Sequence, residues 1–216
     1  MFDERSMASS LAELGYLRLK KQVYRASWSS TDVEHFLFLS LYGGGNYLTC
    51  EFGLRNAAAE RFAVECLRLF AGPVFRDVRF DPRFDCRMRF SLGALAAWPS
   101  RSSLLITGMS DAVLNDKIRS DIKDLLFPVV RWVLSAADFF SFLIRDDESS
   151  RWLKVNGAVR AAKIVYLGRQ LGIQTIELEA MLQPFLHEIG ANIGRGPTED
   201  GVSPAVFLNE VLRYAN

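Results

Sequence analysis

The chain has 216 residues, of which 50% are hydrophobic and 24% charged, a composition that is ordinary for a folded protein and excludes an intrinsically disordered one. Its 26 basic and 25 acidic residues give a formal net charge of +1, so no global electrostatic field would draw it onto nucleic acid or an anionic membrane. This length allows one large domain or two small ones, and we expect a single α+β domain over 1-216.

The cysteines and the start of the chain indicate a cytoplasmic protein. Cys50, Cys66 and Cys86 are an odd number of cysteines spread through apolar stretches, which argues against a disulfide framework and for a reducing compartment. Residues 1–6 lack the basic segment followed by an apolar segment that a secretory signal requires. We therefore expect a cytoplasmic location.

The first predicted elements are a short helix and a basic strand. The helix spans residues 6–14 and ends at Gly15, because glycine adopts the left-handed conformation that stops a helix without a steric clash. Residues 16–27 alternate partly between apolar and polar side chains, and this alternation predicts one strand.

A hairpin is predicted next. Residues 33–42 are almost continuously apolar, as in a central strand covered on both faces, and residues 47–54 place their apolar side chains on one face. The glycines at 43–45 lie between these strands. Backbone N–H groups can approach a phosphate where side chains are absent, but a P-loop needs Gly-Lys-Ser/Thr opening a helix, and here a strand follows. We interpret the glycines as a hairpin turn.

The first half closes with a helix and a further strand. Asn56 can cap a helix over residues 57–71, whose apolar side chains fall at helical spacing, and residues 86–92 alternate as a strand does. Together these elements predict an α+β fold. We expect an antiparallel sheet of at least four strands with packed helices in the strand-rich part (1-110), followed by a helical part (111-216).

Residues 125–144 have the length of a membrane span but not its composition. Pro128, Arg131 and Asp138 interrupt the apolar run, and an arginine or aspartate at the bilayer centre costs about 3 kcal/mol. Ser135 followed by Asp138 instead marks a helix start, because the hydroxyl and the carboxylate can each satisfy a free backbone N–H group. We expect two consecutive buried helices here, and no membrane association.

The remaining periodic segments are helical. Residues 158–171 are apolar around more than half of the circumference, which predicts a helix packed on two sides. Pro184 lies inside the next apolar stripe, so that helix should kink or be two short ones. Ser203-Pro204 is a cap followed by a first-position proline and starts a final helix. Residues 190–201 contain four glycines and a proline and are predicted to be a loop.

Few residues could carry chemistry. His35 and His187 are the only histidines, and neither belongs to a spaced ligand motif such as His-Glu-x-x-His. Each cysteine occupies a core-type apolar position, whereas a nucleophilic thiol needs an exposed, electropositive setting. The sequence therefore predicts no metal site, no cofactor and no catalytic residue, although acid–base catalysis by carboxylates stays open.

The feature that favours binding is basic and local. Arg18, Lys20, Lys21 and Arg25 lie in the first predicted strand, and Arg76, Arg79, Arg83, Arg87 and Arg89 lie around the fourth. If these strands expose their polar faces on one side, the result is a cationic sheet surface with tyrosine and phenylalanine interleaved. We predict Arg18, Lys20, Arg87 and Arg89 as the partner-binding residues. The alternative is a solvated face whose arginines pair with nearby aspartates.

Two stretches resemble a bacterial family of unknown function. Leu14-Gly15-Tyr16, Lys20 and Val23-Tyr24-Arg25 are similar to its "Leu-Gly-Phe … Lys … Phe-Tyr-Arg" opening, and residues 84–95 with Trp98 are similar to its "Asp-Cys-x-x-Arg-x-x-Leu-Gly-x-Leu … Trp" stretch. The resemblance implies an N-terminal helix, a curved antiparallel sheet and trailing helices. It implies no activity, because the family has no assigned function.

Three hypotheses follow. The first is a non-catalytic protein-interaction module, similar to an immunity protein or an antitoxin, that binds a protein partner through its sheet. The second is a small-ligand-binding protein or enzyme with a cleft between the sheet and the C-terminal helices, closed by the glycine-rich loop around Arg195. The third, nucleic-acid binding through the basic strands, is disfavoured by the balanced charge. A homodimer is compatible with each.

Overall fold

The computed structural model describes residues 2–79, 81, 86–145, 157–193 and 202–215. The chain forms two units, each built from separate stretches of sequence: unit 1 comprises residues 1–54 and 89–134, and unit 2 comprises residues 55–88 and 135–216. Both sequence halves contribute to each unit, so the predicted boundary at residue 110 does not coincide with a boundary between the units. The expectation of a single domain stays a prediction.

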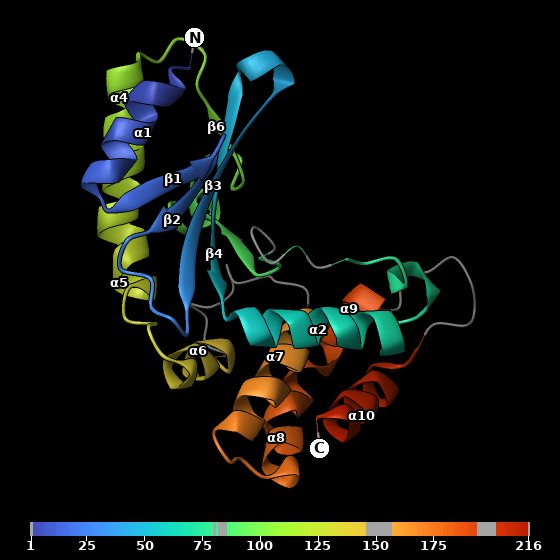
Figure 1. Ribbon diagram of the computed structural model, residues 1–216. Coiled ribbons are helices and arrows are strands. Elements are labelled where there is room, and N and C mark those ends of the chain that lie inside the picture. Colours follow the sequence, from blue (N-terminus) through green and yellow to red (C-terminus); the bar gives the residue numbers. More distant parts are fainter. Residues whose placement is uncertain (1, 80, 82–85, 146–156, 194–201, 216) are drawn as a thin grey trace. The chain divides into compact units, whose positions relative to one another are not determined.

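Unit 1 is built on an antiparallel sheet, which confirms the predicted α+β class (Figure 1). Its main path runs β1-β2-β3-β4-β5, and β6 also pairs with β4. The strands are β1 (Tyr16–Lys20), β2 (Val23–Ala26), β3 (Glu34–Tyr42), β4 (Tyr47–Arg55), β5 (Arg89–Ser91) and β6 (Leu104–Leu105).

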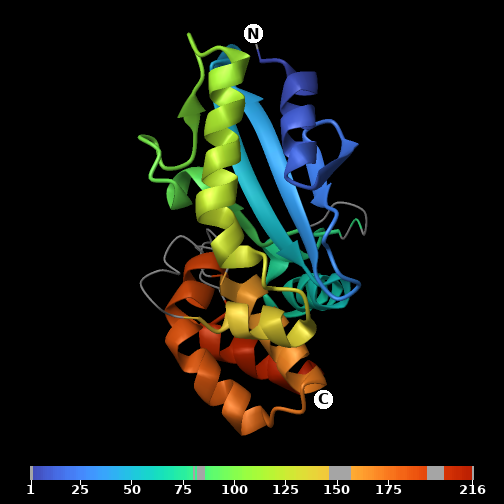
Figure 2. The ribbon, with the colours of Figure 1, turned by 90° about the vertical axis from the view of Figure 1, so that its left-hand side faces the viewer.

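The helices of unit 1 cover one face of this sheet. α1 (Glu4–Glu13) contacts β1 and α4 (Asp111–Ser120), and the latter continues through a π-helical segment (Asp121–Leu126) into α5 (Phe127–Val130). Figure 2 shows α1 and this long helical stretch lying in front of the strands. A short helix, α3 (Leu92–Leu95), follows β5 directly.

The prediction of one strand over residues 16–27 is wrong, because this segment is a two-stranded hairpin. β1 and β2 pair antiparallel, and the chain turns at Lys21 and Gln22. Gln22 has a φ of 61°, a left-handed conformation that sequence rules assign to glycine or asparagine. Because neither glycine nor asparagine occupies this position, the sequence contained no indication of a turn between β1 and β2.

The other strand predictions are confirmed in place but not always in length. Residues 43–45 form the turn between β3 and β4, with all three glycines at positive φ, as the hairpin interpretation requires. The fourth predicted strand is shorter than residues 86–92, because only Arg89–Ser91 pair with β4 before Ser91 caps α3 through the Ala94 N–H group.

Unit 2 is helical and is organised around α7 (Gly157–Gln170). This helix contacts α2 (Ala57–Phe70), α6 (Ala136–Leu143), α8 (Thr175–Leu182), α9 (Leu186–Ile193) and α10 (Pro204–Tyr214). It is buried around most of its circumference, which confirms the predicted two-sided packing. At Gly157 an alanine Cβ would lie 2.5 Å from the backbone carbonyl carbon of Glu188, so the missing side chain lets α7 approach α9 closely.

The predicted capping signals are confirmed in unit 2. Asn56 accepts a hydrogen bond from the Ala59 N–H group, Ser135 and Asp138 form a reciprocal capping box, and Ser203 caps α10. Pro184 lies in a 3-10 turn between α8 and α9, which are two short helices as predicted.

The loop predicted over residues 190–201 begins later than expected. Gly190 belongs to α9, which continues to Ile193, because a glycine inside a helix costs only about 1 kcal/mol and the flanking Ile189 and Ile193 are buried. Residues 194–201, including Arg195, lie outside the described residues. Within the described ranges, no helix has both the length and the apolar character needed to span a bilayer.

Candidate interaction surface

The sheet of unit 1 has one face turned toward its helices and one turned away. On the first face, Tyr16 packs on Phe127 of the helical stretch, and the ring of His35 bonds to the Val133 carbonyl. Because strand residues alternate, Leu17, Phe36 and Phe38 point to the opposite face. Leu17 is 56% exposed, whereas Phe36 and Phe38 are 1% and 5% exposed, so only part of this opposite face, which we call the open face, is exposed.

Two arginines on the open face are paired with carboxylates. Arg25 Nε lies 3.4 Å from Glu34 Oε1, and Arg89 Nη1 lies 3.7 Å from Glu51 Oε2. The Arg89 guanidinium also lies 3.8 Å from the centroid of the Phe38 ring. These contacts reduce the positive charge that Arg25 and Arg89 add to the open face.

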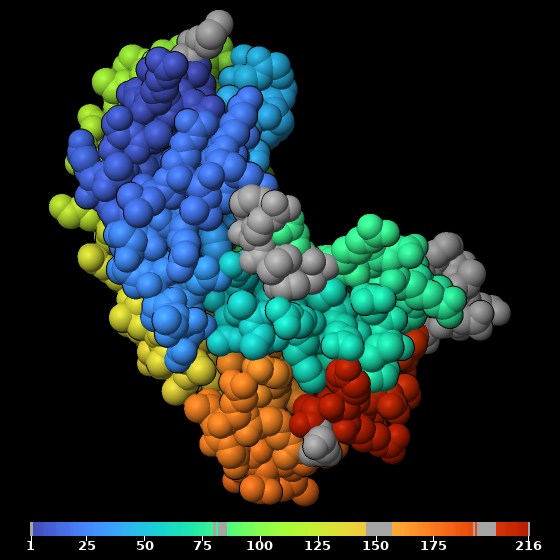
Figure 3. Space-filling view, viewed as in Figure 1, coloured from blue at the N-terminus to red at the C-terminus, as the bar shows by residue number. Residues whose placement is uncertain are grey.

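The hairpin between β3 and β4 extends beyond β1 and β2, and its tip lies at the surface (Figures 1 and 3). Near this tip Tyr42 and Tyr47 stack with ring centroids 5.1 Å apart, and Tyr47 pairs across the sheet with Leu105 of β6. The three side chains are 45%, 37% and 52% exposed, respectively. We call Tyr42, Tyr47 and Leu105 the hairpin-tip cluster.

A cavity of about 380 Å³ lies at the same tip. Leu41, Leu114 and Met109 form apolar parts of its lining, and Gly44 and Gly45 contribute backbone. Leu41 neighbours Tyr42 in β3 and therefore points to the other side of the sheet. The tip thus presents protruding rings on one side and a recess on the other.

The polar lining of this cavity is already engaged by the chain itself. Thr107 Oγ1 donates to Asn46 Oδ1 at 3.0 Å, and Asp111 Oδ1 accepts the Asp3 N–H group at 3.2 Å. These bonds tie the N-terminal segment and the loop after β6 to the tip, and so fix the shape of the recess.

The structure places two of the four predicted partner-binding residues, Arg18 and Lys20, on opposite faces of the sheet. Arg18 lies on the helix-facing side, because it pairs across the hairpin with Tyr24, and it bonds to Glu4 of α1 at 2.7 Å. Lys20 follows a register shift and pairs with Val23, which places it on the open face with Arg89. The two basic residues of β1 therefore point to different sides.

Arg87 belongs to unit 2, whereas Arg89 belongs to unit 1. The backbone N–H group of Arg87 donates to Glu60 Oε1 at 2.9 Å, and its side chain donates to the Arg79 carbonyl at 2.9 Å. Of the predicted residues, Arg83 and Arg195 lie outside the described residues.

His35 and the three cysteines are buried in the protein interior. His35 is buried and donates from Nε2 to the Val133 carbonyl at 2.8 Å, and burial lowers the pKa of its ring. Burial raises the pKa of the Cys66 thiol to about 12 and also raises the pKa of Cys50. All three cysteines are buried thiols. The Cys50 and Cys66 thiols therefore stay protonated, which makes them poor nucleophiles.

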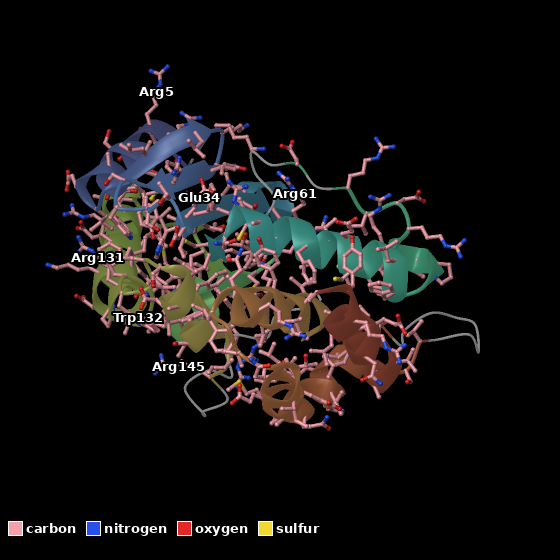
Figure 4. The ribbon with its side chains drawn as sticks, turned by 60° about the horizontal axis from the view of Figure 1, so that its bottom comes forward. Arg5, Glu34, Arg61, Arg131, Trp132 and Arg145 are labelled. Atoms are coloured by element: carbon pink, nitrogen blue, oxygen red, sulfur yellow. The ribbon has the colours of Figure 1, made fainter. Side chains whose placement is uncertain are left out.

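The ring of Trp28 lies between His35 and the Arg131 guanidinium in a series of contacts. The His35 ring lies 6.2 Å from that of Trp28, and the guanidinium of Arg131, labelled in Figure 4, lies 5.2 Å from the Trp28 centroid. Burial penalises a positive charge on His35, which favours the neutral ring. Among the described residues, no three histidine, cysteine or acidic side chains are grouped as a metal site.

Sequence reasoning missed the fully buried ion pair of unit 2. Glu60 and Lys163 are both 0% exposed, and the Lys163 ammonium donates to Glu60 Oε2. Arg160, one turn earlier in α7, is also buried and donates to the Leu143 carbonyl at 2.7 Å. The available signal was the presence of two charged residues inside a helix predicted to be packed on two sides, since such charges need partners.

The comparisons with known proteins give no relative for this chain: no family model, no curated protein and no solved structure matches it. The resemblance of the residues around Gly15 and Cys86 to an uncharacterised bacterial family therefore stays a prediction.

Proposed function

We propose that this chain is a non-catalytic protein-interaction module that binds a partner protein through the open face of unit 1, centred on the hairpin-tip cluster. The observation that carries this proposal is the contiguity of Tyr42, Tyr47 and Leu105, three large apolar side chains exposed side by side on two hairpin strands and β6. Protein interfaces concentrate aromatic and apolar anchors in this way and surround them with polar groups.

The charges around the cluster favour a protein over a nucleic acid. Arg25 and Arg89 each have a carboxylate partner on the same face, so neither adds an uncompensated positive charge. A phosphate backbone is bound by releasing counterions from uncompensated cations, and this face supplies few. Mixed, paired charges instead suit the rim of a protein interface, where they select the partner and its orientation.

The buried thiols and the neutral, buried His35 support binding rather than catalysis. An immunity-like or antitoxin-like protein needs only a surface that covers its target, and no reactive group. Cysteines that are buried thiols agree with a reducing compartment, so we keep a cytoplasmic location as part of the proposal.

The decisive experiment is a photo-crosslinking comparison in cells of the source organism. A photoreactive residue is placed at position 105 in the wild-type background and in a Tyr42→Ala/Tyr47→Ala background, and the crosslinked products are identified by mass spectrometry. We expect one stoichiometric protein partner in the first case and its loss in the second, because the rings form the anchor. The matched control is Ile176→Ala, a truncation of a 76% exposed side chain in unit 2.

Each other outcome would contradict the proposal. Undiminished crosslinking in the double tyrosine variant would show that the hairpin-tip cluster is not the anchor. Crosslinks only to a second copy of this chain would replace a foreign partner by a homodimer, which sedimentation would verify. Crosslinks to RNA or DNA, with affinity that falls steeply with salt, would favour nucleic-acid binding.

The second candidate, a ligand cleft between the sheet and the C-terminal helices closed by the loop around Arg195, stays a prediction. Its central residue lies outside the described residues, and no observation on the described part of the chain favours it over the interaction surface.

A further inference from the structure

A second cavity lies within unit 2, between three of its helices. It has a volume of about 310 Å³ and is lined by Phe62 of α2, by Tyr166, Arg169 and Gln170 of α7, and by Tyr214 and Ala215 at the end of α10. This volume is near the lower end of the range of about 300 to 1,000 Å³ that small-molecule sites occupy, so the cavity suits a ligand of one or two rings.

The walls of this cavity are aromatic. Phe62 lies between two tyrosine rings, with its centroid 5.3 Å from that of Tyr166 and 5.8 Å from that of Tyr214. Tyr214 also packs edge-on against Phe70 at 5.6 Å. Rings at these distances make offset and tilted contacts, which present π surface to a flat group placed beside them.

Hydrogen bonds hold the two tyrosines in position. Gln170 Nε2 donates to the Tyr166 hydroxyl at 2.8 Å, and a hydrogen bond between the Tyr214 hydroxyl and Glu65 raises the pKa of Tyr214. Walls that are already ordered lose little conformational entropy when a ligand binds, so the cavity is prepared for an occupant.

The positive charge of Arg169 in the cavity lining favours one chemical class of ligand. Arg169 is the one ionised side chain among the described residues that line it, and its guanidinium is oriented by a hydrogen bond to the Thr175 hydroxyl. A guanidinium matches the planar geometry of a carboxylate and binds it through charge-assisted hydrogen bonds. Aromatic walls beside one fixed cation therefore favour a flat ring that carries an acidic group.

We propose that this cavity binds small planar aromatic carboxylates, with the ring against Phe62, Tyr166 and Tyr214 and the carboxylate at Arg169. The site lies in unit 2 and is independent of the protein-binding surface proposed for unit 1. A failure of either proposal therefore leaves the other in place.

The test uses the full-length chain and 2-naphthoate as the probe, with binding followed by saturation-transfer NMR and calorimetry. We expect 2-naphthoate to bind about tenfold more tightly than 2-naphthamide, which lacks the charge, and than cyclohexanecarboxylate, which lacks the flat ring. Arg169→Gln should remove the preference for the acid over the amide. Phe62→Leu should weaken both naphthyl compounds alike.

Arg213→Gln is the matched control, because Arg213 lies on α10 but is 76% exposed and pairs with Glu210 outside the cavity. It should leave binding unchanged. Should Arg169→Gln fail to fold, as judged by circular dichroism, the acid, amide and cyclohexyl series on the wild-type chain still decides the question. Equal affinity for 2-naphthoate and 2-naphthamide, or binding that Phe62→Leu leaves intact, would overturn the proposal, as would the absence of binding.

Discussion

The two units bury polar groups in different ways. Unit 2 buries full charges and pairs them: Lys163 bonds to Glu60, and Arg160 bonds to the Leu143 carbonyl and to Glu188. Unit 1 buries one carboxylate, Asp121, with Lys117 and Trp98 as partners, but it also buries neutral polar atoms. Several of these have no hydrogen-bond partner among the described residues, namely Ser10 Oγ, Tyr24 Oη, Trp28 Nε1 and His35 Nδ1.

This difference follows from the cost of each group. An unpaired neutral donor or acceptor in the interior costs about 1–3 kcal/mol, which a large apolar core can absorb. An unpaired buried charge costs several kcal/mol, so it persists only with a partner. Unit 1 therefore tolerates neutral polar atoms without hydrogen-bond partners among the described residues, whereas the buried charges of unit 2 depend on specific partners.

The largest effect is expected at the ion pair of unit 2. Lys163→Ala should lower the free energy of unfolding by about 3–5 kcal/mol, because it leaves the Glu60 carboxylate buried without its cation. Urea denaturation followed by circular dichroism measures the change. The double variant Glu60→Gln/Lys163→Met should recover most of the loss, since the introduced amide oxygen would still accept from the Arg87 N–H group. A double variant as unstable as the single one would contradict this account.

A smaller loss is expected at the buried carboxylate of unit 1. Asp121 Oδ2 accepts a hydrogen bond from Trp98 Nε1 at 2.8 Å and also pairs with Lys117 at 3.1 Å. Trp98→Phe removes the indole donor but leaves the lysine, so unfolding should become easier by about 1–3 kcal/mol. If Trp98→Phe lowered the free energy of unfolding as much as Lys163→Ala does, the proposed difference between the two units would be wrong.

Acid should destabilise unit 1 through His35. Burial lowers the pKa of this histidine below its ordinary value of 6.5, so below pH 6.5 the unfolded chain binds the proton more readily than the folded chain. The contribution of the neutral His35 ring to the free energy of unfolding is therefore complete above pH 6.5. It is lost as the pH falls toward the pKa that His35 has in the folded state. Denaturation of the wild type and of His35→Gln between about pH 8 and pH 5 gives the difference. Parallel curves for the two proteins would contradict the prediction.

The smallest effects come from a matched pair of serines. Ser203→Ala removes the hydroxyl that caps α10 and should cost about 1 kcal/mol. Ser10→Ala removes a buried hydroxyl of unit 1 for which the described residues supply no partner, so stability should stay unchanged or rise. Thermal denaturation of both variants measures their stabilities. A larger loss of stability for Ser10→Ala than for Ser203→Ala would contradict the prediction.

The parts of the fold that local chemistry determines could be predicted from the sequence. Asn56 and Ser203 mark helix starts and Gly15 a helix end, because capping depends on residues within one turn of the terminus. The turn at Gln22 could not be predicted, because its left-handed conformation is imposed by the pairing of β1 with β2 and not by its own preference.

The candidate surface was predictable only in part. Tyr42 and Tyr47 flank the glycine turn in the sequence, so their closeness follows once a hairpin is assumed. Leu105 joins them through a two-residue strand that no periodicity could indicate. The assignment of Arg18 and Lys20 to one surface needed the register, and a one-residue shift in pairing turns a side chain to the other face.

The alternation of the two units along the chain sets an order of events during synthesis on the ribosome. Unit 1 is complete once residue 134 has emerged, whereas α2 leaves the exit tunnel long before α7 does. Until α7 emerges, Glu60 of α2 cannot form its ion pair with Lys163. Unit 1 can therefore fold first, whereas residues 55–88 of unit 2 cannot complete their packing until the last third of the chain has been synthesised.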